Sequence, residues 1–476
     1  MKVLFVEPPP STRWTPGDRT STAGRRHPSL NFTGEQVYSY LNLQCAAVLR
    51  ERGHRVAYLH CQTMGCGLEG FPRYLRETAP DLLVILLEHI TFGVALELAR
   101  VAREQAGARV VFVGPFVTAL DGEVLARSGV DAVCRGEWDY AVAELAEAWE
   151  GGGDPCAVPG VTCRVDGETV RGPDRPPLED LDALPLPAYD LLDLSRFYES
   201  VFKRFPAATM ITSRGCPHRC VFCSFPQTIY SRRHRASSPE RVLAEVGHLV
   251  RDHGVREIRF DDDCFEVDRG RVLRICELLE REKLDLIWSA QCRPGNVDPE
   301  LARAMKRAGC HFVLYGVESG DDAVLKKMRK GTTVEAIRRG VRAAREAGID
   351  VLNCIMLGFY WDTPETIRRT VEFAFELNAE FTQFSIPTPL PGTEYYELLR
   401  AEGCLASENW EEFDSFHRAS VRLPHLPPGH LEEVMATIYR RYYLRPGYLW
   451  RMVRRGLRSW DNFSQSIRGA RTLLRV

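Results

Sequence analysis

The fold of this 476-residue chain is decided by the stretch Gly215-Cys216-Pro217-His218-Arg219-Cys220-Val221-Phe222-Cys223. Its three cysteines stand in a CxxxCxxC spacing directly after a run with strand character, Thr209–Ser213, so one loop can bring three thiols to one metal centre. A structural zinc site uses four ligands, usually as two pairs, and no second pair lies nearby in the sequence. Three thiolates on a cubane iron–sulfur cluster leave one iron open for a reactant. The spacing therefore favours an iron–sulfur cluster.

Strand and helix patterns alternate on the carboxyl side of these cysteines. Helical patterns follow each of the first five of six predicted strands, which are Thr209–Ser213, Glu257–Phe260, Leu286–Ala290, Phe312–Gly316, Val351–Leu357 and Phe381–Ile386. Six strand–helix units are too few for a closed eight-stranded barrel. We therefore expect a partial (β/α)6 TIM barrel over residues 206–400.

The first 150 residues also alternate short apolar runs with amphipathic helical patterns. Buried strands that alternate with helices predict a Rossmann-like parallel sheet covered on both faces. Five prolines in residues 171–190 then predict a linker over residues 151–205. Residues 401–476 are expected to form a helical C-terminal region. The predicted fold class is thus α/β, with a Rossmann-like sheet, a partial barrel and a helical end.

Composition excludes several classes of protein. A net charge of −2 argues against a protein that binds nucleic acid by bulk charge. The longest apolar run is Leu82–Leu87, far short of the ~18 residues that span a membrane, and MKVLFVEPPP does not resemble a signal peptide. We expect a cytoplasmic protein whose cysteines are reduced.

The last 37 residues are strongly basic, with ten arginines and one acid, Asp461, from Arg440 onward. Two interpretations are open. The helices of this region either lie on a membrane surface or cap the barrel while their arginines extend into solvent. The second interpretation is preferred.

Polar and glycine residues follow the predicted barrel strands at their carboxyl ends, where barrel chemistry takes place. These landmarks are Asp261-Asp262, Arg293, Gly316-Val317-Glu318-Ser319-Gly320 and Pro389-Leu390-Pro391-Gly392-Thr393. Together with the cysteine motif they resemble the radical S-adenosylmethionine (radical SAM) superfamily over about 190 residues. In that superfamily the open iron of a [4Fe–4S] cluster holds SAM, and one electron cleaves it to a 5′-deoxyadenosyl radical.

The resemblance implies a role for each matching residue. Cys216, Cys220 and Cys223 would ligate the cluster, and Phe222 would lie near the adenine. The remaining implied SAM contacts are Asp261 and Asp262 for the amino group, Arg293 for the carboxylate, and Glu318 for the ribose or amino group. Cys264, Cys292 and Cys354 are interpreted as ordinary buried residues.

The N-terminal region resembles the cobalamin-binding class of radical SAM proteins in Val6-Glu7-Pro8-Pro9-Pro10, Leu41–Val56 and Arg135-Gly136-Glu137. The resemblance implies cobalamin as a third cofactor, with contacts from Pro8, Thr91, Gly114 and Glu137. No Asp-x-His-x-x-Gly motif follows the first strand, so no histidine is offered as a lower cobalt ligand. Pro115 also replaces one glycine of the usual Gly-Gly pair.

The resemblance implies a methyltransferase that acts on an unactivated carbon through methylcobalamin and a 5′-deoxyadenosyl radical. A cobalamin-dependent cyclase, oxidase or rearrangement enzyme is the alternative, and a cobalamin or iron–sulfur sensor is a distant one. The partners expected are a small-molecule or natural-product substrate and a low-potential electron donor such as flavodoxin or ferredoxin. Residues in a phase that suits the barrel interior are Ser289, Gln291, Tyr315, Asn353, Gln383 and Ser385.

Overall fold

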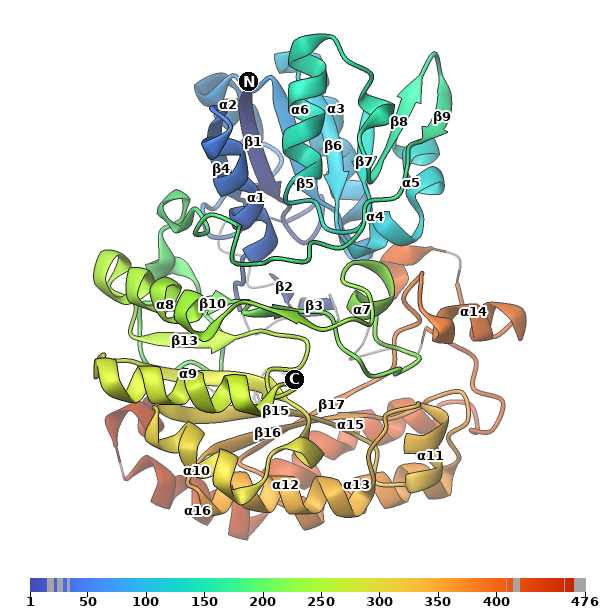
Figure 1. Ribbon diagram of the computed structural model, residues 1–476. Coiled ribbons are helices and arrows are strands. Elements are labelled where there is room, and N and C mark those ends of the chain that lie inside the picture. Colours follow the sequence, from blue (N-terminus) through green and yellow to red (C-terminus); the bar gives the residue numbers. More distant parts are fainter. Residues whose placement is uncertain are drawn as a thin grey trace.

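Two sheets organise the chain, one in each half (Figure 1): the second is entirely parallel, and the first is parallel except for its last two strands. The structure, a computed structural model, describes residues 1–14, 21–23, 29–31, 35–407, 409–413, 420–457 and 459–465. Outside the sheets lie two short antiparallel pairs, β2–β3 (Ser21–Ala23 and Ser29–Asn31) and β11–β12 (Ser213–Arg214 and Arg235–Ala236). Within the described residues, no helix combines the length and hydropathy needed to cross a bilayer.

The first sheet has the strand order β4-β1-β5-β6-β7-β8-β9. Its strands are β1 (Lys2–Glu7), β4 (Arg55–His60), β5 (Leu82–Leu86), β6 (Arg109–Val113), β7 (Ala132–Cys134), β8 (Val161–Val165) and β9 (Glu168–Arg171). Its helices are α1 (Tyr40–Glu51), α2 (Phe71–Thr78), α3 (Phe92–Ala106), α4 (Pro115–Ala119), α5 (Asp121–Ser128) and α6 (Ala141–Gly151). Phe5 and Leu4 on β1 belong to different hydrophobic clusters, so both faces of this sheet are covered, as predicted.

The prediction of a plain linker over residues 151–205 is wrong for its first part. β8 and β9 form an antiparallel hairpin that pairs with β7 and extends the first sheet. β8 is short, but Val161 and Cys163 point into the core while the side chains of β9 are exposed at the sheet edge. The hairpin ends at Arg171, just before the first of the five prolines, so the proline-rich composition describes only the part of the segment after β9.

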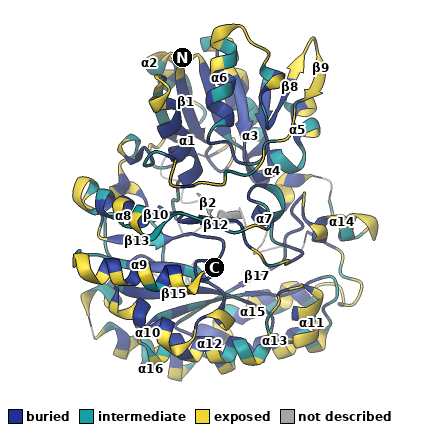
Figure 2. Cartoon of the chain, in the orientation of Figure 1, coloured by how far each residue is buried: buried dark blue, intermediate teal, exposed yellow. Residues whose placement is uncertain are grey.

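The second sheet is a six-stranded parallel sheet of order β10-β13-β14-β15-β16-β17, which confirms the partial barrel. Its strands are β10 (Ala207–Met210), β13 (Glu257–Phe260), β14 (Ile287–Cys292), β15 (Cys310–Glu318), β16 (Asp350–Met356) and β17 (Phe381–Ser385). The helices between them are α8 (Pro239–His253), α9 (Arg269–Glu282), α10 (Pro299–Arg307), α12 (Val334–Glu346) and α13 (Pro364–Leu377). In Figure 2 the strands are dark blue and teal, and the outer faces of these helices are yellow, the pattern of helices that cover a buried sheet.

The two open edges of the partial barrel are covered by tyrosine hydroxyls. On β10, the Tyr38 hydroxyl accepts from the Thr209 N–H and donates to the Thr209 carbonyl, both at 2.8 Å. On β17, the Tyr443 hydroxyl likewise bonds to both the N–H and the carbonyl of Thr382, and the Tyr439 hydroxyl bonds to both groups of Phe384. Unpaired edge groups of a sheet otherwise template the addition of another strand. Side chains therefore complete both edges.

The C-terminal region is helical only in part. Helices α15 (His430–Tyr443) and α16 (Pro446–Gly456) pack on β17, where Tyr448 donates to the Glu380 carbonyl at 2.8 Å. Before them, the described residues 409–413 reach the first domain. The Trp410 ring lies 4.7 Å from that of Phe116, and Gly93 donates its N–H to Glu411 at 2.9 Å.

Replacement of Tyr443 by phenylalanine should destabilise the barrel, because it leaves the buried N–H and C=O of Thr382 without partners. Each lost partner costs ~1–3 kcal/mol. We expect a lower urea midpoint for Tyr443→Phe. Tyr74→Phe is the matched control, since the Tyr74 hydroxyl makes no hydrogen bond with the described residues, and equal midpoints for both variants would refute this account.

The buried carboxyl group of Glu245 links a helix of the barrel to the first domain. Glu245 of α8 accepts hydrogen bonds from the hydroxyls of Tyr40, on α1, and Tyr189, at 3.2 and 2.7 Å. Burial raises the pKa of Glu245 from 4.5 to about 7, although the two hydroxyls oppose the shift. The carboxyl is therefore largely protonated in the folded protein at pH 6 and ionised in the unfolded chain.

This difference predicts a pH dependence of stability. Glu245 binds its proton more tightly in the folded protein, so its contribution is complete below pH 4.5 and is lost as the pH rises toward 7. The full loss is about 3 kcal/mol. We expect the free energy of unfolding, measured with urea between pH 4.5 and 7.5, to fall less steeply for Glu245→Gln than for the exposed control Glu240→Gln. Parallel curves for the two variants would contradict the assignment.

Candidate functional site

The cysteine loop begins at a position that only glycine fits. Gly215 follows β11 with a φ of +84°, and a Cβ there would lie 2.2 Å from the Arg233 carbonyl oxygen. The loop is held at its other end by Gln227 of α7 (Phe225–Thr228), whose amide donates to the Cys223 carbonyl at 2.7 Å. Two fixed ends keep the three thiols within one short loop.

The surroundings of the loop suit a thiolate-ligated cluster. The Cys216 and Cys264 sulfurs and a His218 ring nitrogen lie within 4.8 Å of one another. A guanidinium nitrogen of Arg293 lies 3.8 Å from the Cys220 sulfur. Burial lowers the pKa of His218 to about 4, helped by the positive charges of Arg293 and Lys330. Soft sulfur donors beside two cations fit an anionic iron–sulfur cluster.

Two residues near the loop were not predicted. Cys264, expected to be an ordinary buried cysteine, lies beside Cys216. Lys330 is buried and pairs with Glu318 at 2.7 Å. A Cβ on Gly316 would lie 2.5 Å from the Glu318 carboxylate, so this glycine makes room for the pair. Nothing in the spacing of Lys330 to the cysteines signals this contact.

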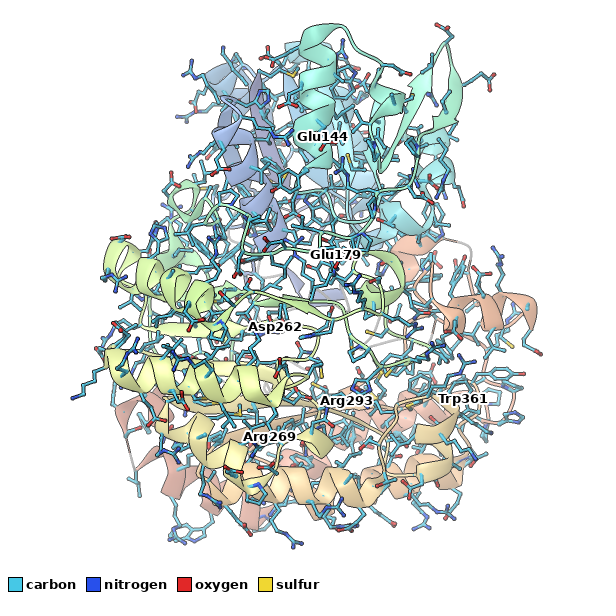
Figure 3. All side chains as sticks on the ribbon, viewed as in Figure 1. Glu144, Glu179, Asp262, Arg269, Arg293 and Trp361 are labelled. Atoms are coloured by element: carbon cyan, nitrogen blue, oxygen red, sulfur yellow. The ribbon has the colours of Figure 1, made fainter. Side chains whose placement is uncertain are left out.

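The predicted SAM residues surround the loop but differ in what they contact. Both carboxylate oxygens of Asp262 accept from Thr212, and one also accepts from the Ser213 N–H. Asp262 thus anchors the backbone that leads into the cysteine loop, while Asp261 pairs with Arg259 at 3.0 Å. Figure 3 shows Asp262 and Arg293 in the central region of the molecule, below the first sheet.

An aromatic contact borders the loop on another side. Phe222 packs edge-on against Phe359, with ring centroids 5.4 Å apart, at the end of β16. The Arg293 guanidinium is held by the Lys330 carbonyl, and its backbone N–H donates to Glu266 at 3.0 Å. A guanidinium fixed in this way can meet a carboxylate with two parallel hydrogen bonds. Contacts of Phe222, Asp261, Asp262, Arg293 and Glu318 with SAM itself stay predictions.

Four of the six predicted pocket residues have the phase of the barrel interior. Ser289 and Gln291 alternate with Trp288, Ala290 and Cys292, which pack against the outer helices. Gln383 and Ser385 alternate with Phe384 in the same way. The Ser289 hydroxyl and the side-chain amide oxygen (Oε1) of Gln291 are buried without a hydrogen-bond partner in the described residues. Buried, unpaired polar atoms of this kind suit a polar ligand.

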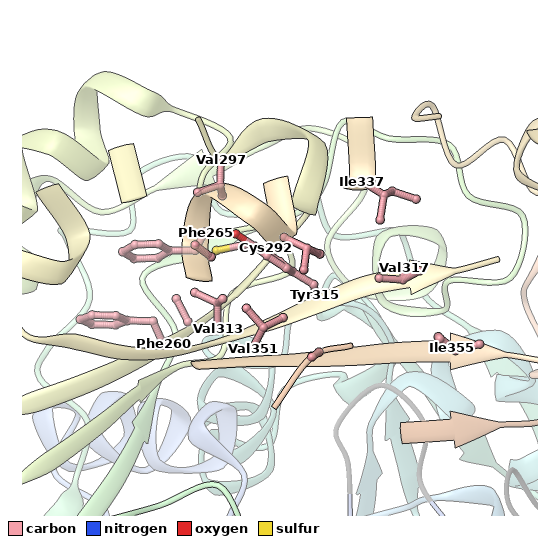
Figure 4. Packing of buried hydrophobic residues seen from close by; sticks show 14 of the residues in the cluster. Phe260, Phe265, Cys292, Val297, Val313, Tyr315, Val317, Ile337, Val351 and Ile355 are labelled. Carbon is pink, nitrogen blue, oxygen red and sulfur yellow. The ribbon is translucent and has the colours of Figure 1, made fainter. Parts of the chain in front are cut away.

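The predictions for Tyr315 and Asn353 are wrong. In the register of the sheet Cys292 pairs with Tyr315, and Tyr315 pairs with Asn353, so all three share the face that the helices cover. Figure 4 shows Tyr315 beside Cys292 in this hydrophobic cluster. Both residues belong to the packing of the barrel wall.

The carboxyl ends of the first sheet form the other side of the site. Between β1 and β5 the strand order reverses, and ligands of open α/β sheets bind at such a point. Glu7 ends β1 and Glu88 follows β5 by two residues, and burial raises their pKa values to about 7 and about 8. At neutral pH Glu88 is therefore mostly protonated and Glu7 partly so, which limits the negative charge at this edge of the sheet.

Of the predicted cobalamin contacts, two lie at strand ends of the first sheet, and the other two have side chains that bond to other protein groups. Pro8 and Gly114 lie at the ends of β1 and β6, as expected, and Gly114 has a φ of +129°. The Thr91 hydroxyl is bonded to the Glu88 backbone at 3.1 and 3.2 Å. The structure corrects the role of Glu137, whose carboxylate is engaged by other protein groups.

A buried ion-pair network between the domains occupies Glu137. Arg214, next to the cysteine loop, donates to Glu137 at 2.9 Å and forks onto Asp139 at 2.6 and 2.8 Å. Arg235 of the paired strand β12 also binds Glu137. The four side chains are at most 5% exposed and carry two charges of each sign. This arrangement fixes the cysteine loop against the first domain.

Comparisons with known proteins agree with this geometry. The family model of the radical SAM superfamily matches residues 210–374, and that of the B12 binding domain matches residues 42–146. An uncharacterised methyltransferase of Pyrococcus horikoshii is 30% identical over 452 residues, 94% of each chain. The anaerobic magnesium-protoporphyrin IX monomethyl ester cyclase of Rubrivivax gelatinosus is 27% identical over 332 residues, 67% of this chain and 58% of the cyclase.

A solved structure has the same fold. The radical SAM methyltransferase TsrM of Kitasatospora setae, with cobalamin and a [4Fe–4S] cluster bound, superposes with a TM-score of 0.68 at 19% identity, over 84% of this chain and 75% of TsrM. The chain belongs to the radical SAM superfamily. Within it, the chain is a member of the cobalamin-dependent radical SAM methyltransferase family, whose cofactors are a [4Fe–4S] cluster, SAM and cobalamin.

Loss of the Arg214 charge should destabilise the protein strongly, because it leaves Asp139 buried without its partner. Removal of one member of a buried pair costs roughly 3–5 kcal/mol, whereas Arg196→Gln, in the exposed pair with Asp193, should cost about 1 kcal/mol or less. Chemical denaturation of Arg214→Gln and Arg196→Gln compares the two. Adding Asp139→Asn to Arg214→Gln should recover part of the loss, and no recovery would contradict the explanation.

Proposed function

We propose that the protein transfers a methyl group to an unactivated carbon of a small-molecule substrate held between its two sheets. One observation carries the proposal: the cluster loop and the carboxyl ends of the first sheet border the same region. Gly392, after β17, approaches both domains, since a Cβ there would lie 2.7 Å from side-chain carbons of Ala119, on α4, and Thr228, on α7. Two cofactors bound at these places would face a common substrate.

The proposed roles of the chain are binding and orientation. When bound, the cluster, SAM and cobalamin supply a hydrogen-abstracting radical and a transferable methyl group. Arg293 orients the SAM carboxylate, and the Glu318–Lys330 pair offers a carboxylate and an ammonium at the same rim. Ser289 and Gln291 hydrogen-bond the substrate through atoms that otherwise lack partners. Orientation of this kind and exclusion of water both favour the radical step over side reactions.

A second function is ring formation without methyl transfer. The similarity to the Rubrivivax gelatinosus cyclase supports this alternative. The cluster loop, Arg293 and the first sheet would serve both reactions, so only the products separate them. A low-potential electron donor such as flavodoxin or ferredoxin would supply the electron in either case, and a cytoplasmic location would suit such a donor.

The test uses the full chain, purified without oxygen, with its cluster reconstituted and cobalamin added. A low-potential reductant and methyl-deuterated SAM are supplied, and 5′-deoxyadenosine, S-adenosylhomocysteine and deuterium on cobalamin are quantified. We expect all three, since methyl transfer requires the label to reach the cobalamin. 5′-Deoxyadenosine without S-adenosylhomocysteine would reject methyl transfer in favour of the cyclase alternative.

Two variants sharpen this experiment. Cys216→Ala combined with Cys220→Ala and Cys223→Ala should abolish formation of 5′-deoxyadenosine and lose the iron of the cluster. Gln291→Leu should retain the cluster and weaken turnover of a substrate once one is found. Asn353→Leu is the control, because Asn353 lies on the face of the sheet that the helices cover. If it lowered turnover as much as Gln291→Leu does, the assignment of Gln291 to the barrel interior would be contradicted.

A further inference from the structure

Large exposed apolar side chains are concentrated at one end of the chain. The described residues include ten of them, and seven lie between residues 444 and 463. We call these seven the C-terminal apolar patch: Leu444, Leu449, Trp450, Val453, Leu457, Trp460 and Phe463. Leu457 and Trp460 are 81% and 77% exposed, values far from those of core residues. Contiguous exposed apolar residues mark an interaction site more often than single ones do.

The patch is held rigidly by the opposite face of α16. Tyr448 is buried against the barrel, and Arg455 pairs with Asp350 at 2.6 Å. Leu449, Val453 and Leu457 recur at four-residue steps and therefore share the outward face. α16 lies at the end of the molecule far from the first sheet (Figure 1), so this face points away from the cofactor site.

The patch continues beyond α16. The rings of Trp460 and Phe463 pack with centroids 5.5 Å apart, and Phe463 lies 3.4 Å from the position that a Cβ on Gly456 would take. This contact places Phe463, and with it the Trp460 ring, next to the end of α16.

Cations surround the patch. Arg440, Arg441 and Arg454 make no ion pair with any other described residue, although most arginines of the barrel helices do. The single acid of the region, Asp461, pairs with Arg204 at 3.3 Å. The surface is therefore apolar at its centre and positively charged at its edge.

We propose that the C-terminal apolar patch docks on a lipid bilayer that contains anionic lipids. Tryptophan and leucine side chains insert at the level of the headgroups, and the arginines bind lipid phosphates. An anionic bilayer complements both the exposed apolar side chains and the arginines that make no ion pair with other described residues. The two interpretations of these basic helices are compatible, because the buried face of α16 caps the barrel while its opposite face exposes apolar side chains. This inference does not depend on the proposed reaction.

The test is sedimentation of the full chain with vesicles of phosphatidylglycerol and phosphatidylcholine in equal parts. We expect saturable binding that weakens about tenfold or more when salt is raised, because the arginine contacts are screened. The variant Trp450→Ser, Leu457→Ser, Trp460→Ser should bind at least about tenfold more weakly, since the apolar surface is lost. Val165→Ser with Val170→Ser removes exposed apolar side chains of the β8–β9 hairpin and should bind as the unaltered protein does.

A second measurement does not depend on the variants folding. Brominated phosphatidylcholine in the vesicles should quench tryptophan fluorescence of the unaltered protein, because Trp450 and Trp460 would lie among the acyl chains. No binding to anionic vesicles, no quenching, or equal binding by the folded patch variant would each overturn the proposal. A dimer in solution that the patch variant abolishes would also overturn it, by assigning the patch to a second copy of the chain.

Discussion

The guanidinium of Arg214 is the group on which the arrangement of the two halves depends. It is nearly inaccessible to water, and it meets carboxylates of the first domain only one residue before the loop that carries the thiols. A buried charge is tolerated only when its partners compensate for lost hydration. Any shift of one domain against the other would separate these charges in a medium of low dielectric constant, so the network favours a single relative position.

The consequences reach both sides of the site. Glu137 and Asp139 follow β7, whose neighbour β6 leads to Gly114 and lies next to β5, one of the two strands at the reversal point of the first sheet. Asp262 fixes the segment just before Arg214 through Thr212 and Ser213. The approach to the cysteine loop is thus held by both domains.

Much of this organisation was predictable from the sequence because it is periodic or local. Alternating apolar runs specify both sheets, and the CxxxCxxC spacing specifies the loop. The face of the sheet on which Tyr315 and Asn353 lie was not predictable, because alternation along one strand does not fix the register of that strand with its neighbour. Register shifts between Trp288 and Ser289 and between Gly316 and Glu318 change that relation along β15. Cys264 and Lys330 reach the site only through long-range packing, which leaves no local signal.

The tyrosines at the two sheet edges have a consequence for how such a barrel can change. Two residues four apart on a helix are separated by about 6 Å, and two residues two apart on a strand by about 6.7 Å. A single helix can therefore serve successive outward-facing residues of an edge strand, as α15 does on β17. An edge completed by hydroxyls offers no template for another backbone. The barrel can therefore remain open between its edge strands, which leaves space for large ligands, without exposing an edge that promotes aggregation.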